Sequence, residues 1–282
     1  MVTPFAEDGS VDEAAARSLA RRLLDNGSHG LVVAGTTGEG ATLTDAEQIS
    51  LLEAIVDEAG DDALIVCGSG TNDTRHSQEL SKAAEAAGAD ALLVVTPYYN
   101  KPNRAGLLGH FGAVAGSVKL PVILYNIPSR SVINLPPDLL AELAQIDNIV
   151  AVKQANNEEL GPVEGLDILA GNDDVFFRTL ELGGTGGICV ASHLVGNEMR
   201  ELYEAAKVGD LAGAREIDTK LQPFFEALAV TTNPIPVKAG LELLGICSAR
   251  ARLPIVEADD EQRDVVRKAL EAQGLLSAAT SG

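Results

Sequence analysis

The chain has 282 residues, and its 41 acidic against 21 basic side chains give a formal charge of −20. This charge excludes bulk attraction to nucleic-acid backbone or to an anionic membrane, because the protein's field repels phosphates. A hydrophobic content of 46% excludes a disordered chain. No apolar run approaches the roughly 20 residues that a membrane helix needs. We expect a folded protein that binds an anionic substrate only at a local positive site.

Short β-type runs alternate with helical ones along the chain, which is typical of a parallel sheet with crossover helices. Runs such as "LVVAG" and "VILYN" are continuously apolar, as strands buried on both faces are. Thr44 and Glu47 have the spacing of a capping box at a helix start. The predicted strands are Gly30–Ala34, Ala63–Cys67, Ala91–Thr96, Pro121–Tyr125, Ile149–Lys153, Asp167–Ala170 and Gly187–Val190. The helices predicted among them are Val11–Asn26, Thr74–Ala87, Arg104–Ser117, Pro137–Gln145 and Asp174–Leu182, besides the one that Thr44 caps.

An eighth strand would complete a (β/α)8 TIM barrel, and its natural place is before the first helix. Only Met1–Phe5 is available there, so this strand is expected to be very short or cut away. After the last strand, helical patterns follow at Glu198–Lys207, Leu211–Val230, Pro236–Leu244 and Asp260–Gln273. We predict a barrel over residues 1–210 that carries the active site, followed by a C-terminal helical region over 211–282.

The N-terminus and the cysteines indicate the compartment. Met1–Phe5 runs into acidic residues without the basic flank and apolar stretch of a signal peptide, which predicts a cytoplasmic protein. Cys67, Cys189 and Cys247 lie on apolar stretches and are expected to be buried free thiols. Neither the cysteines nor the four histidines show ligand spacing, so no metal site is predicted.

In a barrel of this type the active site lies where the strands end, so the residues after each apolar run are the candidates. Gly35–Glu39 follows the first predicted strand, and its glycines and the hydroxyls of Thr36 and Thr37 suit a small carboxylate. A plain turn with hydroxyls capping the next helix is the alternative. Glu39 is interpreted as a structural residue at the helix entry rather than a catalytic acid.

Tyrosines and one arginine follow two further strands. Tyr98 and Tyr99 follow one strand and Tyr125 ends the next, although the chain has only 4 tyrosines. Phenols can relay protons without adding negative charge, and the alternative is packing under loops. Arg130 stands close to a strand end, where its guanidinium suits bidentate recognition of a carboxylate.

Lys153 is the most informative residue, because it closes a strand directly after four apolar residues. Desolvation frees a lysine amine to attack a carbonyl, which favours Schiff-base chemistry. The alternatives are a lysine that extends out of the barrel mouth or one paired with Glu158 or Glu159. The glycine run Gly183–Gly187 precedes a strand, which favours a tight turn over a phosphate site.

Taken together, these motifs resemble those of the dihydrodipicolinate synthase / N-acetylneuraminate lyase family of pyruvate-dependent class I aldolases. The resemblance covers nearly the whole chain, and its ordered set of motifs is specific. The motifs are Gly35–Glu39, Tyr98–Pro102, Tyr125–Arg130, Val152–Lys153, Gly171–Asp174, Asn233–Lys238 and Arg252–Pro254.

The resemblance implies a substrate pair and a role for each site residue. The two threonines and the arginine match the members that condense pyruvate with aspartate semialdehyde in lysine and diaminopimelate biosynthesis. Lys153 is then the Schiff-base residue, and no separate cofactor is implied. Tyr125, Thr36 and Tyr99 are implied as the proton relay, with Tyr99 donated by a neighbouring subunit of a homotetramer built as a dimer of dimers. Substrate binding is implied for Thr37, Arg130, Gly171 and Ile188.

Two segments of this chain differ from the family's usual pattern, and each difference leads to a prediction. Residues 154–165 are too few for the usual helix, so a short helix or a loop is expected there. The family's lysine feedback site is matched by Asn72 and Tyr98, but His76 stands where lysine-inhibited relatives have a glutamate. We therefore expect weak or absent inhibition by lysine.

Two other functions remain open from the sequence. One is a pyruvate aldolase or dehydratase of the same superfamily that acts on a 2-keto-3-deoxy sugar acid, although Arg130 argues against a hydroxyl-reading loop. The other is a non-catalytic paralogue, which the joint presence of Lys153, Tyr125, Tyr99 and Thr36 disfavours.

Overall fold

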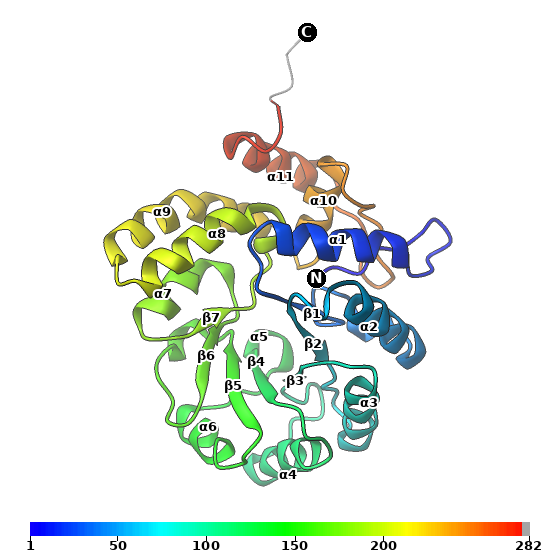
Figure 1. Ribbon diagram of the computed structural model, residues 1–282, viewed down its shortest axis with the longest axis vertical. Coiled ribbons are helices and arrows are strands. Elements are labelled where there is room, and N and C mark those ends of the chain that lie inside the picture. Colours follow the sequence, from blue (N-terminus) through cyan, green and yellow to red (C-terminus); the bar gives the residue numbers. More distant parts are fainter. Residues whose placement is uncertain (278–282) are drawn as a thin grey trace.

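The computed structural model describes residues 1–277, so the last five positions of the predicted C-terminal region lie outside it. The described part holds a curled parallel sheet of seven strands that pair in chain order (Figure 1). The strands are β1 (Gly30–Val33), β2 (Leu64–Gly68), β3 (Ala91–Val95), β4 (Val122–Asn126), β5 (Ile149–Gln154), β6 (Asp167–Ala170) and β7 (Gly186–Gly187).

Helices cover the outside of the curled sheet (Figure 1). The capping box that Thr44 and Glu47 predict is present at the start of α2. The first set of helices is α1 (Glu13–Asp25), α2 (Asp45–Ala59), α3 (Thr74–Ala86), α4 (Arg104–Ala115), α5 (Pro128–Ser131), α6 (Pro137–Leu143) and α7 (Phe176–Glu181). They are followed by α8 (Ser192–Lys207), α9 (Leu211–Leu228), α10 (Ile235–Leu243) and α11 (Asp260–Ala272). Short 3₁₀ turns lie at Gly40–Thr42, Asn157–Glu159 and Asp173–Val175.

The alternation of side chains along each strand produces two apolar layers. One lies between sheet and helices and includes Leu124 and Val152. The other fills the interior of the curled sheet and includes Ile123 and Ala151. Tyr125 and Lys153 each follow an interior residue by two positions, so the strand period turns both side chains toward the interior.

Strand β7 is shorter than the sequence predicts, which corrects the expectation of a strand over Gly187–Val190. The cause is a side chain, because the Asp173 carboxylate accepts the backbone N–H groups of Val190 (2.7 Å) and Ala191 (3.1 Å). Those donors are therefore not free for a strand ladder. Helix α8 begins at Ser192, ahead of the predicted start at Glu198.

Two expectations about connecting segments are confirmed. Between Lys153 and β6 only a 3₁₀ turn forms, in place of a crossover helix. The run Gly183–Gly187 forms a tight turn, in which Gly183 has a φ of +92° and the Gly184 N–H donates to the Thr179 carbonyl at 2.8 Å.

Residues 1–5 lie along β1 without forming a strand, so the predicted eighth strand is not present among the described residues. The Met1 amine donates to the Val32 carbonyl (2.6 Å), and the Thr3 hydroxyl donates to the Gly38 carbonyl (2.6 Å). The Val2 N–H donates to His193 Nε2 at 3.0 Å. The segment is thus anchored to both β1 and α8.

The cysteines differ in part from expectation. All three are free thiols, but only Cys67 is buried, while Cys189 and Cys247 are partly exposed. Cys189 is partly exposed and lines the cavity described below. None of the helices within residues 1–277 is both long enough and apolar enough to cross a membrane.

Candidate active site

The main cavity has a volume of about 600 Å³ and contains the lysine that the sequence singles out. Thr36, Thr37, Lys153 and Ile188 all line it. The cavity continues between β1 and β7 toward Tyr203 of α8. The fold thus brings together four of the predicted site residues from three separate strand ends.

Lys153 and Tyr125 are adjacent at the carboxyl edge of the sheet. They are register partners on β5 and β4 and are only 8% and 4% exposed. The Lys153 Nζ lies 4.2 Å from the centroid of the Tyr125 ring, over its face. The Glu159 carboxylate accepts instead from the Asn134 side chain (2.9 Å), and Lys153 has no ion pair among residues 1–277. A buried amine without a carboxylate partner is suited to attack a carbonyl carbon.

The threonine loop Gly35–Glu39 is a tight turn beside this lysine. The Glu39 N–H donates to the Thr36 carbonyl (3.1 Å), and the Gly40 N–H donates to the Gly35 carbonyl (3.2 Å). Glu39 itself has a φ of +54°, a left-handed conformation that residues other than glycine seldom adopt. Its carboxylate is paired with Lys238, which supports the structural interpretation of this residue.

Arg130 lies on the short helix α5, which the sequence reasoning did not predict and which Pro128 begins. Its guanidinium is exposed and donates to the Thr232 hydroxyl and the Asn233 carbonyl, both at 3.2 Å. The Asn233 amide in turn donates to the Thr37 hydroxyl at 2.9 Å. Asn233 therefore links the two groups proposed to bind carboxylates. The sequence predicts no role for Asn233, although the residue lies in the motif Asn233–Lys238.

A network of amides supports the segment that carries Arg130. Asn126 is fully buried at the end of β4, and its amide donates to Asn134 (2.9 Å) and Gln154 (3.0 Å). The Leu135 N–H donates back to the Asn126 side-chain oxygen at 3.0 Å. The segment between α5 and α6 is thereby tied to the end of β5, next to Lys153.

Gly171 and Ile188 border the same strand ends. The Gly171 N–H donates to the Gln154 carbonyl at 2.8 Å, and a Cβ at this position would lie only 2.7 Å from that oxygen. Only glycine fits so close to the residue that follows Lys153. The Ile188 N–H donates to the Ala170 carbonyl at 2.9 Å, which holds the residue at the cavity wall.

Asp173 is a further titratable group at this edge, and no role is predicted for it from the sequence. Burial raises the pKa of its carboxyl group to about 6, while the two N–H donors of Val190 and Ala191 and the charge of Lys153 oppose this rise. A signal was present in the sequence, because Asp173 lies in the recognised motif after β6. Its partners lie beyond β7 and are not evident from the motif.

Tyr98 and Tyr99 lie in the loop after β3 and are not in the cavity. Tyr99 is 88% exposed and has a φ of +73°. A side chain this exposed is not packed beside Lys153, so one chain by itself does not bring Tyr99 into the site.

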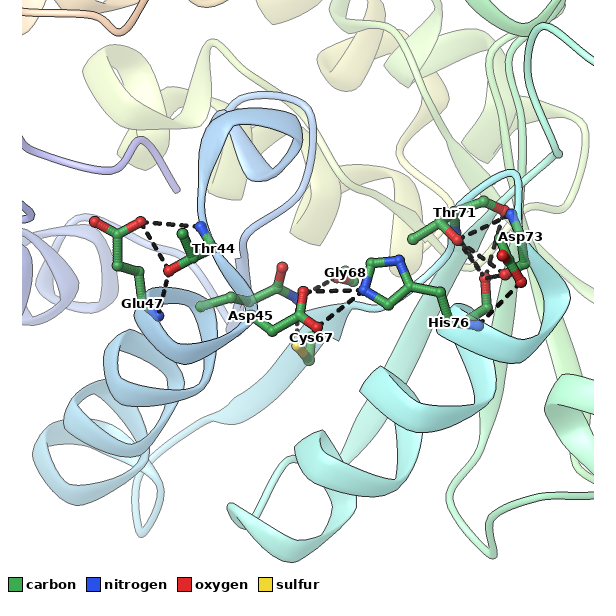
Figure 2. A network of polar contacts seen from close by, with 10 residues as sticks. Thr44, Asp45, Glu47, Cys67, Gly68, Thr71, Asp73 and His76 are labelled. Atoms are coloured by element: carbon green, nitrogen blue, oxygen red, sulfur yellow. Dashed lines mark hydrogen bonds and ion pairs between the residues drawn. The ribbon is translucent and has the colours of Figure 1, made fainter.

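One of the predicted effector residues, His76, makes a hydrogen-bond contact that the sequence does not suggest. His76 at the start of α3 points toward Asp45 at the start of α2, and its Nε2 lies 2.9 and 3.0 Å from the two carboxylate oxygens (Figure 2). The Asn72 carbonyl accepts from the Asn100 amide at 2.8 Å, which ties it to the loop of Tyr98. An acidic group is therefore present beside His76, on the neighbouring helix.

A buried lysine and tyrosine at the carboxyl edge of a curled parallel α/β sheet are the arrangement of a class I aldolase. The model of the dihydrodipicolinate synthetase family matches residues 1–273, and the chain belongs to this family. The 4-hydroxy-tetrahydrodipicolinate synthase of Moorella thermoacetica is 44% identical over 98% of this chain and 97% of its own length. That of Mycolicibacterium paratuberculosis is 45% identical over 98% and 94%.

Solved structures agree with this assignment. A crystal structure of a dihydrodipicolinate synthase matches with a TM-score of 0.95 and 39% identity, over 98% of both chains. The enzyme of Cyanidioschyzon merolae with lysine bound matches with a TM-score of 0.94 and 38% identity, over 98% of this chain and 97% of the other.

Proposed function

We propose that this protein is a 4-hydroxy-tetrahydrodipicolinate synthase, a lyase that condenses pyruvate with aspartate semialdehyde in lysine and diaminopimelate biosynthesis. The observation that carries the proposal is the buried amine of Lys153, 4.2 Å from the Tyr125 ring centroid, in one cavity with Thr36 and Thr37. The near full-length similarity to enzymes of that name supports the choice of substrates.

The reaction begins when the Lys153 amine attacks the keto carbon of pyruvate and water leaves, which gives a protonated imine. Loss of a methyl proton turns the imine into an enamine, and its carbon attacks the aldehyde of the semialdehyde. The aldehyde oxygen takes up a proton and becomes a hydroxyl group. The amine of the second substrate then attacks the imine, closes the ring and releases Lys153.

The neutral and cationic side chains divide the remaining tasks. Thr36 and Thr37 hold the pyruvate carboxylate through hydroxyl and backbone N–H groups. Tyr125 moves protons at the imine, and its link through Thr36 to Tyr99 extends the relay. Arg130 binds the carboxylate of the semialdehyde, while Gly171 and Ile188 border the space for the substrates. No cofactor beyond the lysine is required.

The assembly that completes this relay is a homotetramer in which Tyr99 enters the neighbouring subunit's site. The 88% exposure of Tyr99 supports this, because a site residue so exposed in one chain needs a second chain to cover it. A relative described as a monomeric dihydrodipicolinate synthase variant has a TM-score of 0.94 and 36% identity to this chain. Oligomeric state is thus a property to measure for each member.

We also infer that the curled sheet is a (β/α)8 barrel whose seam is closed by Met1–Phe5. The hydrogen bonds of Met1 to β1 and of Val2 to α8 support this closure. The division at residue 210 and the cytoplasmic location remain predictions of the sequence.

A steady-state assay with each of the two candidate substrates, aspartate semialdehyde and a 2-keto-3-deoxy sugar acid, tests the proposed function. We expect turnover of pyruvate with aspartate semialdehyde, and none in cleavage or dehydration of a 2-keto-3-deoxy sugar acid. Turnover of the sugar acid alone would replace the proposal by the second function that the sequence left open. Arg130 favours the semialdehyde, because its guanidinium matches a second carboxylate.

A further inference from the structure

A buried ion pair joins the threonine loop to helix α10. The Glu39 carboxylate pairs with the Lys238 ammonium, and the two residues are 5% and 1% exposed. The second oxygen of Glu39 accepts the Arg252 backbone N–H at 3.0 Å. Lys238 donates also to the Arg250 carbonyl (2.6 Å) and lies over the Phe5 ring, with its Nζ 4.4 Å from the centroid.

The presence of this buried ion pair is not explained by a gain in stability. Removing two charges from water costs about as much as their attraction returns, so a buried ion pair is weak evidence for a stabilising role. Burial does lower the pKa of Lys238, and the Glu39 carboxylate opposes that shift. A pair that gains little stability can still fix the relative position of the two segments that it joins.

The geometry of the threonine loop shows what is fixed. Glu39 is two residues from Thr37, and its left-handed backbone is held from both sides, since its N–H donates within the loop and its carbonyl accepts from Thr42 at 2.9 Å. The segment just before α10 reaches the same loop a second time, through the hydrogen bond from the Asn233 amide to the Thr37 hydroxyl. Helix α10 and the segment that leads into it therefore contact the loop at two points, one on each side of Gly38.

We propose that Glu39 and Lys238 are positioning residues for the pyruvate carboxylate site, and that helix α10 holds the threonine loop in its binding geometry through them. The inference rests on the proposed function, in which Thr36 and Thr37 bind the carboxylate of pyruvate. It assigns the predicted C-terminal helical region a part in substrate binding. Neither residue touches the reacting atoms.

The test is a titration of Schiff-base formation, in which borohydride traps the adduct at increasing pyruvate concentration. The variants are Glu39→Gln, Lys238→Met and the double variant. The double variant leaves no charge unpaired, so we expect it to melt near the wild-type temperature when each single variant melts lower. The control is Arg263→Met, which removes the pair of Arg263 with Glu242 of α10 (2.6 Å) and leaves the threonine loop untouched.

We expect Glu39→Gln, Lys238→Met and the double variant each to raise the half-saturating pyruvate concentration about tenfold, which corresponds to about 1.4 kcal/mol. The KM for the semialdehyde should stay within about twofold, because Arg130 binds that substrate, and Arg263→Met should titrate as the wild type. The inference would be overturned, and the proposed function left standing, by either of two results. One is a double variant with the wild-type half-saturating pyruvate concentration, and the other is an equal rise in the half-saturating pyruvate concentration and in the KM for the semialdehyde. A wild-type protein that forms no pyruvate adduct would overturn the proposed function and the inference with it.

Discussion

The chemical role that we propose for Lys153 follows from its place in a strand. The four apolar residues before it predict burial, and the strand period turns it toward the interior beside Tyr125. Lys153 could be selected from the sequence for this reason, and Tyr125 because three of the four tyrosines lie at two strand ends. Asn233 and Asp45 could not, because each acts on a residue far away in the chain, on Thr37 and His76 respectively.

Arg130 provides a prediction about substrate discrimination. Replacing it in Arg130→Met removes the charged partner of the semialdehyde carboxylate, a contact worth about 2 kcal/mol. The KM for aspartate semialdehyde should rise about 30-fold, while half-saturation by pyruvate stays unchanged. Steady-state kinetics with each substrate varied in turn measures both values.

The matched control for Arg130 is Arg104→Met. Arg104 is also an exposed arginine, and it pairs with Asp138 at 2.6 Å on the outer helices. Its loss should alter neither constant. Equal effects of Arg130→Met on both substrates would show that Arg130 acts on the fold rather than on one carboxylate.

Asp173 predicts a dependence of stability on pH. Burial raises its folded pKa to about 6 from the ordinary 3.8, so the folded protein holds this proton more tightly than the unfolded chain. That contribution is complete below about pH 4 and is lost as the pH rises through 6. The free energy of unfolding of the wild type relative to Asp173→Asn should therefore fall by up to about 3 kcal/mol across this range.

Urea unfolding of both proteins between pH 4 and 7 measures the difference. Asp174→Asn is the control, because Asp174 is an exposed neighbour on the same turn and the variant keeps Asp173. Parallel stability profiles of the wild type and Asp173→Asn would refute the assignment.

Among the secondary-structure elements, the strands that are buried on both faces are the ones that the sequence predicts best. Strands β1 to β6 are predicted to within a few residues because parallel strands buried on both faces leave continuous apolar runs. Strand β7 is not, since the Asp173 carboxylate takes the N–H groups that a longer strand would use. Helix α5 is too short to leave a periodic pattern, and its start at Pro128 follows from the end of β4.

The loop after β3 predicts complementation between two inactive variants. If Tyr99 serves the neighbouring subunit, Tyr99→Phe and Lys153→Ala each abolish most activity alone. Mixed dimers hold one site with both residues intact, so an equal mixture refolded together should recover about a quarter of wild-type activity.

Activity of the co-refolded mixture is compared with that of the two variants refolded apart and then combined. Recovery only after joint refolding supports a shared site. An active Tyr99→Phe protein, or no recovery in the mixture, would mean that Tyr99 does not complete a neighbour's site.

The contact between α2 and α3 bears on regulation by lysine. His76 stands where lysine-inhibited relatives have a glutamate, and Asp45 places a carboxylate beside it. That carboxylate is already in contact with the His76 imidazole (Figure 2). We therefore still expect weak or absent lysine inhibition in the wild type. His76→Glu should lower the inhibitory lysine concentration about tenfold or more, because it adds an unpaired carboxylate for the ammonium group.

Inhibition curves at fixed pyruvate measure this, and His76→Gln is the control that removes the imidazole without adding charge. Inhibition of the wild type by micromolar lysine would contradict the expectation. An unchanged curve for His76→Glu would show that lysine does not bind beside Asp45.

For the whole molecule, the charge of −20 predicts a concentrated positive site for an anionic substrate, which we propose Lys153 and Arg130 provide. On the outer helices, acidic side chains form ion pairs with arginines. Arg17 and Arg21 of α1, for example, pair with acidic residues of α2 and of the turn after it. The sequence predicted a barrel with an appended helical region. The structure adds that α10 of that region contacts the threonine loop, a long-range relation that no local pattern reveals.

Borohydride trapping followed by peptide mass spectrometry tests directly whether Lys153 forms a Schiff base with pyruvate. We predict one reduced pyruvate adduct per chain, on the peptide that contains Lys153, and none in Lys153→Ala. Absence of an adduct in the wild type, or an adduct on another lysine, would show that Lys153 is not the Schiff-base residue.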